Sequence, residues 1–432
     1  MQLVMTVYML LLVCYGTAQL PIFQTNQYRD GAANELTWME NRLSMNLTPL
    51  GHWLLSPEGT IPPPKISNRT KPFLILVWKH GPYLERRHLR RFSQNKIFSP
   101  WDSCSVNNCR LSYDPRLLIS ADAVLFHLHR LTSKNELPQL QHRPVNQRWI
   151  FLTDESPINT FVAATMRRGL TRSKLKLSEF DGLFNWSMSY RMDSDVPVPY
   201  GRTVLRSSNI VERGNESDEE IVLKRGMIPF ADRGLVAVLG SNCGGANGRW
   251  GYIERLKGVL GDDLQILGRC LSGNRTACPG HFDSDCSALK GAFKFYLAFE
   301  NSNCREYLSE KLWWQAYAKS SVPVIMGAPK SDCLRLLPPN SYLHVDDYHS
   351  PEHLANRLIL LGKNRKKYER LQLGWRKRYK ILNEHGYFGS PSAHYCRLCQ
   401  ALNYNSNETK IYWDLEEFWS AERDCRFYKP YA

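Results

Sequence analysis

Short apolar runs separated by longer polar stretches dominate the sequence from residue 73 onward. In the first half these runs cover residues 73–78 (FLILVW), 123–126 (AVLF) and 148–152 (RWIFL). In the second half they cover residues 235–239, 293–299 and 322–325. Apolar runs of this length without polar alternation are typical of parallel strands that are buried on both faces.

Helices are expected between these runs, over about Trp250–Leu260 and Glu306–Lys319. Strands that alternate with helices predict βαβ units and parallel sheets. We therefore expect an α/β fold of two Rossmann-like domains that face each other across a cleft. In such folds ligands bind beyond the carboxyl ends of the strands.

Changes in composition along the chain predict its domain organisation. Residues 1–18 are almost entirely apolar and indicate either a signal anchor or a signal peptide that is cleaved near Ala18. Residues 19–70 mix polar residues with prolines and predict a stem, and the charged stretch 212–224 separates two halves. The expected folded parts are one Rossmann-like domain at 71–215, a second at 216–390 and a Cys-containing C-terminal segment at 391–432.

The net charge of +15 suits an anionic partner. The basic residues are scattered, and no stripe interleaves them with aromatic residues as in a nucleic-acid-binding module. We therefore expect no nucleic-acid partner, and a nucleotide-diphosphate substrate fits the charge as well.

Cysteines and glycosylation sequons favour the secretory pathway, since the chain holds twelve cysteines and six N-x-S/T patterns. The candidate glycosylation sites are Asn46, Asn68, Asn215, Asn274 and Asn407. The sixth, Asn185, lies inside a motif described below and is expected to be structural. No second CxxC or His pair completes a zinc site around Cys396 and Cys399, so these two, together with Cys104 and Cys109, are disulfide candidates of open connectivity.

The segment 293–327 (FKFYLAFENSNCREYLSEKLWWQAYAKSSVPVIMG) reads as strand, loop, helix and strand. Glu300 and Asn301 fall at the strand end, and Tyr307, Glu310 and Lys311 fall in the first turns of the helix. A helix N-terminus with a nearby lysine suits a diphosphate. On spacing alone, solvated first-turn residues are the favoured interpretation of Glu310 and Lys311.

This segment resembles the donor-binding signature of family 10 α1,3/4-fucosyltransferases, roughly YKFxLxFENSxxxxYxTEKLWxNAL followed by VPV. The resemblance implies a GT-B type fold and donor contacts to GDP-fucose from Tyr307, Glu310 and Lys311, with Glu300 and Asn301 beside them. Residues 235–249 (LVAVLGSNCGGANGR) resemble the family's strand followed by SNC, which implies that Arg249 contacts the GDP phosphates. The second domain would then bind GDP-fucose and the first the acceptor.

Residues 154–157 (DESP) match the family's ESP after a predicted strand. The resemblance implies an inverting single displacement, for which Glu155 is the candidate general base. A helix-capping role explains the same residue, and Asp154 beside it is the natural alternative. His127 and His129, in a segment similar to the family's ADAVVFHHR, are candidates for the acceptor side or for simple packing.

Residues 184–201 (FNWSMSYRMDSDVPVPYG) resemble the family's FNWTMSYRRDSD…PYG. Asp193 and Asp195 imitate a DxD metal motif, but a polar turn that joins the domains is the preferred interpretation. We expect no required metal or cofactor beyond GDP-fucose as donor, although a divalent ion such as Mn²⁺ could stimulate activity.

The Gly-rich loop, the doubled Trp313-Trp314 and the Cys-containing tail look closest to core α1,3-fucosyltransferases, which act on the innermost GlcNAc of N-glycans. The resemblance thus implies an α1,3-fucosyltransferase in the Golgi membrane, single-pass and type II, with a lumenal catalytic part. A soluble lumenal or secreted protein follows if the signal is cleaved. A Lewis-type or protein-directed fucosyltransferase and an inactive lumenal glycan-binding protein are the alternatives.

Overall fold

The computed structural model describes residues 46–56, 61–67, 69–92, 95–161, 175–206, 228–272, 278, 286, 289, 291–408 and 410–426. The apolar segment 1–18, most of the expected stem, the charged stretch 212–224 and the sequons at Asn68, Asn215 and Asn274 lie outside these residues. Asn46 and Asn407 are exposed. Among the described residues, no helix is both long enough and apolar enough to cross a membrane.

Six parallel strands form the sheet of the N-terminal half, in the order β2-β1-β3-β4-β5-β6. Their bounds are β1 Phe73–Val77, β2 Cys109–Ser112, β3 Ala123–His127, β4 Arg148–Thr153, β5 Trp186–Ser189 and β6 Val196–Pro197. Successive side chains point to opposite faces, so Ile75 and Leu125 pack into one core while Leu76 and Phe126 pack into another. Burial on both faces explains why these strands read as unbroken apolar runs.

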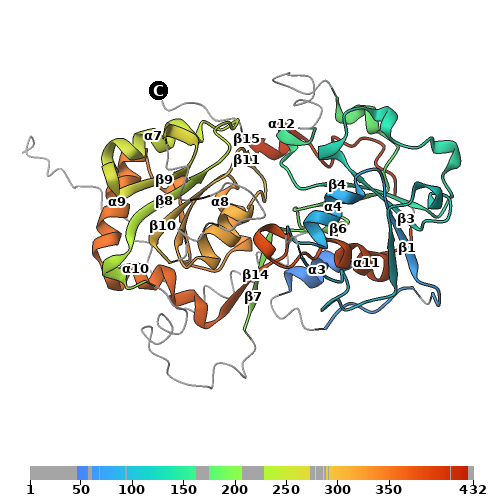
Figure 1. The fold of residues 1–432 in the computed structure, drawn as a ribbon, viewed down its shortest axis with the longest axis horizontal. Helices are drawn as coiled ribbons and strands as arrows, with labels where there is room; N and C mark the ends of the chain where they lie inside the picture. Colours follow the sequence, from blue (N-terminus) through green and yellow to red (C-terminus); the bar gives the residue numbers. More distant parts are fainter. Residues whose placement is uncertain are drawn as a thin grey trace, which may run out of the picture. The chain divides into compact units, whose positions relative to one another are not determined.

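Three helices contribute to the same core on one face of this sheet: α3 (Pro49–Leu55), α4 (Gly81–His88) and α11 (His394–Tyr404). Helices α3 and α11 come from opposite ends of the described chain and lie side by side (Figure 1). Leu50 of α3 and Leu398 of α11 are fully buried in this core. The packed part of the chain therefore begins inside the span that the sequence assigns to a stem.

Five parallel strands form the sheet of the C-terminal half, in the order β13-β12-β10-β8-β9. Their bounds are β8 Gly234–Gly240, β9 Leu264–Gly268, β10 Phe293–Phe299, β12 Val322–Met326 and β13 Leu343–His344. Helices α7 (Arg249–Leu260), α9 (Pro351–Lys363) and α10 (Arg365–Gln372) pack into the core on one face (Figure 1). The π-helix η12 (Lys311–Ala318) and α8 (Lys330–Leu336) pack into the core on the other face.

Two antiparallel pairs complete the strands: β7 (Gly201–Leu205) with β14 (Tyr379–Asn383), and β11 (Asn303–Cys304) with β15 (Cys425–Arg426). A short helix, α12 (Ala421–Asp424), precedes β15. The α/β class with two parallel, Rossmann-like sheets that the sequence predicts is confirmed.

The strand order locates the ligand-binding edge of each sheet. In both sheets the first strand along the chain lies between the second and the third, so the order reverses between β1 and β3 and between β8 and β10. Ligands bind beyond the carboxyl ends of strands at such a switch point. In the C-terminal sheet that edge carries the loop 241–248 after β8 and Glu300 after β10.

Candidate active site

Glu155 lies two residues beyond the end of β4 and is half-buried, unlike its buried neighbours. Its Oε2 atom accepts a hydrogen bond from the Tyr307 hydroxyl at 2.9 Å and another from Asn301 Nδ2 at 3.3 Å. Both donors belong to the segment that follows β10. The structure therefore brings three of the predicted site residues together across the two halves of the fold.

Asp154, the neighbouring carboxylate, has a different environment because it is 3% exposed and paired with Arg87. Its Oδ1 atom also lies 3.1 Å from His394 Nε2 and 3.2 Å from His385 Nε2. Burial by itself would raise the pKa of Asp154, but Arg87 and His385 hold it well below its usual range. Asp154 is thus a buried anion that holds elements of the N-terminal half to the C-terminal segment.

His127 belongs to this buried group, since it is 1% exposed and its Nε2 lies 3.6 Å from Asp154 Oδ2. Burial lowers the pKa of His127 to about 4 and keeps the ring neutral. A side chain this deeply buried fits packing in the core better than contact with an acceptor. His129 is half-buried, with Nδ1 3.4 Å from the Asn159 carbonyl, and is the more accessible of the two.

His88, Asp154 and His394 lie close enough together to suggest a metal site. However, the rings of His88 and His394 stack at 3.8 Å with an interplanar angle of 27°. Nitrogen lone pairs lie in the ring plane, so stacked rings cannot direct them at one ion, and Arg87 already neutralises the carboxylate. These residues do not fit a metal.

Lys311 is the centre of a second polar cluster, at the start of η12. Its Nζ atom lies 3.0 Å from Glu300 Oε2, 3.2 Å from Glu310 Oε1 and 2.9 Å from Ser309 Oγ. Burial would lower the pKa of Lys311, but Glu300 and Glu310 raise it, so the ammonium stays charged. Its side chain is 22% exposed, which leaves the charge reachable by a ligand.

Glu300 supports this cluster from inside, because it is 1% exposed and accepts hydrogen bonds from the Ser309 amide and hydroxyl. Burial raises the pKa of Glu300. Its fixed carboxylate positions Lys311 and the first turn of the helix.

The start of η12 differs from the sequence-based expectation. The helix begins at Lys311 rather than near Glu306, and Glu306 adopts a left-handed φ of 56°. Tyr307 therefore precedes the helix instead of lying in its first turns. From this position the Tyr307 hydroxyl reaches Glu155.

Arg249, predicted to contact phosphates, is 5% exposed at the first position of α7. Its guanidinium donates to the carbonyls of Phe299, Asn242 and Gly244. In this structure Arg249 therefore orders the loop at the switch point. Gly245 in that loop has a φ of 151°, and a Cβ there would lie 3.1 Å from the Asn301 carbonyl. Glycine permits this close approach.

Asp193 and Asp195 point at different partners. Asp193 pairs with Arg191 and Arg305, whereas Asp195 accepts from the Ser187 amide and from Tyr412. The two carboxylates are thus engaged separately, each with its own partners.

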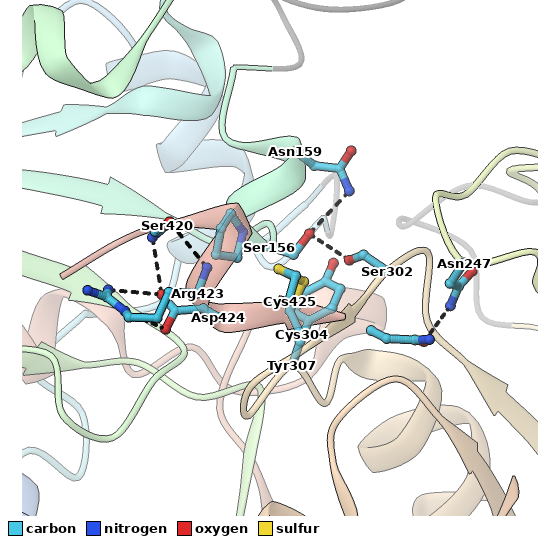
Figure 2. The surroundings of a disulfide bond; sticks show 12 residues. Ser156, Asn159, Asn247, Ser302, Cys304, Tyr307, Ser420, Arg423, Asp424 and Cys425 are labelled. Atoms are coloured by element: carbon cyan, nitrogen blue, oxygen red, sulfur yellow. Dashed lines mark hydrogen bonds and ion pairs between the residues drawn. A yellow bond between two sulfur atoms is a disulfide. The ribbon is translucent and has the colours of Figure 1, made fainter. Parts of the chain in front are cut away.

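Disulfides tie the C-terminal segment to the rest of the fold. Cys104 pairs with Cys396 and Cys109 pairs with Cys399, which gives the connectivity that spacing left open. The pairs Cys243–Cys270, Cys278–Cys286 and Cys304–Cys425 were not expected. Figure 2 shows the Cys304–Cys425 bridge next to Tyr307.

Sequence reasoning missed the serines of the site. Ser302 Oγ lies 2.6 Å from Ser156 Oγ, and this contact joins the residues next to Asn301 and Glu155 (Figure 2). Ser309 donates two hydrogen bonds to Glu300, as described above. Ser156, Ser302 and Ser309 all lie inside the motifs quoted from the sequence. Their position next to the predicted site residues is the signal by which they could have been found.

Comparisons with known proteins give matches to family models and to individual relatives. The family model described as "Glycosyltransferase family 10 (fucosyltransferase) C-term" matches residues 231–419, and "Fucosyltransferase, N-terminal" matches residues 70–201. The chain is 32% identical to mouse "Alpha-(1,3)-fucosyltransferase 7" over 374 residues, which cover 85% of this chain and 80% of that protein.

A second relative and a solved structure complete the comparison. Drosophila melanogaster "Glycoprotein 3-alpha-L-fucosyltransferase A" is 27% identical over 326 residues, covering 74% of this chain and 56% of that protein. A solved structure titled "Crystal Structure of alpha1,3-Fucosyltransferase" aligns with a TM-score of 0.45 at 15% identity, over 84% of this chain and 99% of that chain. These comparisons do not show a core GlcNAc specificity.

Proposed function

Because the chain belongs to the family 10 fucosyltransferases, we propose that it transfers L-fucose from GDP-fucose to a GlcNAc of glycoprotein N-glycans in α1,3 linkage. The proposal rests on one observation: Tyr307 and Asn301, from the segment after β10, donate hydrogen bonds to the Glu155 carboxylate beyond the end of β4. One group from the N-terminal half thus meets the signature segment of the C-terminal half.

In the proposed mechanism Glu155 is the general base of an inverting single displacement. It takes the proton from the acceptor hydroxyl as that oxygen attacks the anomeric carbon from the face opposite GDP. The bond to the diphosphate breaks at the same time, and GDP leaves with the electron pair. A positioned base of this kind contributes about 10²–10⁴-fold to the rate.

The donor site is proposed at the carboxyl ends of β8 and β10. Lys311 supplies a charge that Glu300 and Glu310 hold in place. Arg249 orders the adjacent loop through three backbone carbonyls, and the same side chain would reach the phosphates if the loop rearranged. Fixed positive charge here stabilises the leaving diphosphate, so we propose that no metal is required and that Mn²⁺ at most stimulates.

The acceptor and the compartment are the finer parts of the proposal. The disulfides favour an oxidising lumen, and we propose a type II Golgi membrane protein anchored by residues 1–18, with a cleaved signal as the alternative. The core GlcNAc is the first acceptor to test, and an antennal GlcNAc, as in Lewis-type enzymes, is the second.

The test uses the full-length protein in detergent with GDP-fucose or GDP-mannose and two defined N-glycans. One glycan offers only core GlcNAc residues, and the other adds LacNAc antennae. Mass spectrometry after glycosidase digestion locates the added fucose, and NMR gives the anomeric configuration. Fucose on the antennae alone would replace the core assignment. GDP-fucose binding without transfer to either glycan would support an inactive glycan-binding protein and overturn the proposal.

A further inference from the structure

We propose that Tyr307 and Asn301 are positioning residues for the general base, holding Glu155 by one carboxylate oxygen so that the other faces the acceptor. The inference rests on the proposed function and deepens it. The sequence resemblance implies for Tyr307 a contact with the donor, whereas its hydroxyl here lies 2.9 Å from Glu155 Oε2.

The Tyr307 ring is held by packing on two sides. Tyr307 is 2% exposed, and its centroid lies 5.0 Å from that of Tyr190 and 6.4 Å from that of Tyr200. A ring confined in this way has few alternative rotamers, so its hydroxyl points in a fixed direction. Tyr307 therefore donates its hydrogen bond to Glu155 from a fixed position.

The Asn301 amide is oriented by its own neighbours. Its Oδ1 atom lies 3.0 Å from Ser302 Oγ, which leaves Nδ2 directed at Glu155 Oε2. The Asn301 carbonyl accepts from the Ala246 amide, which ties this residue to the Gly-rich loop. Next to it, the contact between Ser302 and Ser156 fixes the residue after Glu155 (Figure 2).

Both donors converge on Oε2, and Glu155 Oε1 accepts no hydrogen bond from the described residues. The uncommitted oxygen is the one that can take a proton. Positioning a base in this way fixes the direction of proton transfer without a contact between Tyr307 and the sugar. Tyr307 and Asn301 both follow β10. The half of the fold that is proposed to bind GDP-fucose therefore also sets the orientation of the general base.

The experiment compares Tyr307→Phe with Tyr190→Phe in the full-length protein. Tyr190 is the matched control, because its hydroxyl is buried next to the same ring and has no hydrogen-bond partner among the described residues. For Tyr307→Phe we expect kcat to fall by about 10-fold, with the KM for GDP-fucose within a few-fold. The acidic limb of the pH–rate profile should move to higher pH by about 0.5–1 unit, since the ionised carboxylate loses a hydrogen bond. Tyr190→Phe should leave the kinetics unchanged.

A double-mutant cycle separates this role from a donor contact. If Tyr307 acts through Glu155, then Tyr307→Phe should change kcat less than 2-fold when Glu155→Gln is already present. An equal loss in both backgrounds, or a raised donor KM with an unmoved acidic limb, would overturn the inference. Absence of fucosyl transfer by the unmodified protein would instead overturn the proposed function.

Asn301→Ala provides a second, independent variant if Tyr307→Phe fails to fold. It should move the acidic limb in the same direction by a smaller amount, since its bond to Oε2 is longer. An unmoved limb in this variant contradicts the inference equally.

Discussion

Two consecutive carboxylates, Asp154 and Glu155, have opposite surroundings and should respond differently to the same substitution. Glu155 is half-buried and bonded to neutral donors, so Glu155→Gln should leave the free energy of unfolding nearly unchanged. Turnover should fall by about 10²-fold or more, with GDP-fucose affinity within a few-fold. The measurement is steady-state kinetics across pH, and the acidic limb should disappear. Glu416→Gln, at an exposed position, is the control.

For Asp154→Asn the predicted change is in stability. The substitution removes the anion that pairs with Arg87, a side chain that is 2% exposed. A buried charge left without its partner costs about 3–5 kcal/mol. Urea unfolding measures this loss, and a variant as stable as the unmodified protein would show that Arg87 finds another partner. The sequence offers Asp154 only as the alternative to Glu155, because its burial is not visible there.

At the scale of elements, the two disulfides of α11 predict a non-additive effect. Cys104–Cys396 and Cys109–Cys399 span 292 and 290 residues. While one bridge remains, the other closes only a loop of roughly ten residues, so removing either pair alone costs about 3 kcal/mol in the chain-entropy model. Removing both opens the long loop as well, and the loss should exceed the sum of the single losses by roughly 3 kcal/mol.

Paired Cys→Ser variants, unfolded in urea without reductant, measure these losses. Removing Cys278–Cys286, which spans 8 residues, is the control for a short loop. Additive losses for the two long bridges would mean that α11 stays docked through its packing alone.

The elements that could be predicted from the sequence are those whose buried side chains are apolar, since such side chains need no hydrogen-bond partner. Strands β1, β3, β4, β8, β10 and β12 are apolar runs and lie where the runs predict them. Strand β5 was missed because it contains Ser187, which is buried only because Asp195 and Tyr412 bond to it. Helix α11 was missed for a similar reason, since its buried Arg397 and Asn403 depend on Glu384 and Asn108.

The same reasoning applies to the site. Motif matches predicted which residues to consider, and the structure joins Glu155, Asn301 and Tyr307 as well as Glu300, Glu310 and Lys311. The orientation of Tyr307 could not be predicted, because it depends on a helix that starts later than its sequence suggests.

For the whole molecule, buried histidines should make folding sensitive to mild acid. Burial lowers the pKa of five of them, to about 4 for His127. The other four are His88, His344, His385 and His394. Below pH 6.5 the unfolded chain takes up protons on these rings that the native chain does not. Their contribution is therefore complete above pH 6.5 and is lost as pH falls toward 4, at about 1.4 kcal/mol per pH unit for each proton.

Two buried glutamates, Glu306 and Glu300, oppose this trend. Burial raises the pKa of both, to about 7 for Glu306, so the Glu306 contribution is complete below pH 4.5 and is lost as pH rises through 7. Five histidines outweigh two glutamates, and the midpoint of thermal unfolding should fall from pH 7 to pH 5. His127→Asn should weaken this dependence, and His52→Gln, at an exposed position, should not. A midpoint that is higher at pH 5 than at pH 7 would contradict the assignment of neutral native histidines.

Helix α11 also has a consequence for the order in which the protein is made. Leu398 and Leu402 of this helix complete the layer over β1 and β3. These strands leave the ribosome roughly 270 to 320 residues earlier than α11. At about 5–20 residues per second, the nascent N-terminal half exposes that apolar face for tens of seconds before its cover is synthesised. The first half to emerge is thus the last to finish folding, and a chain cut short before residue 394 would be a ready client for chaperones.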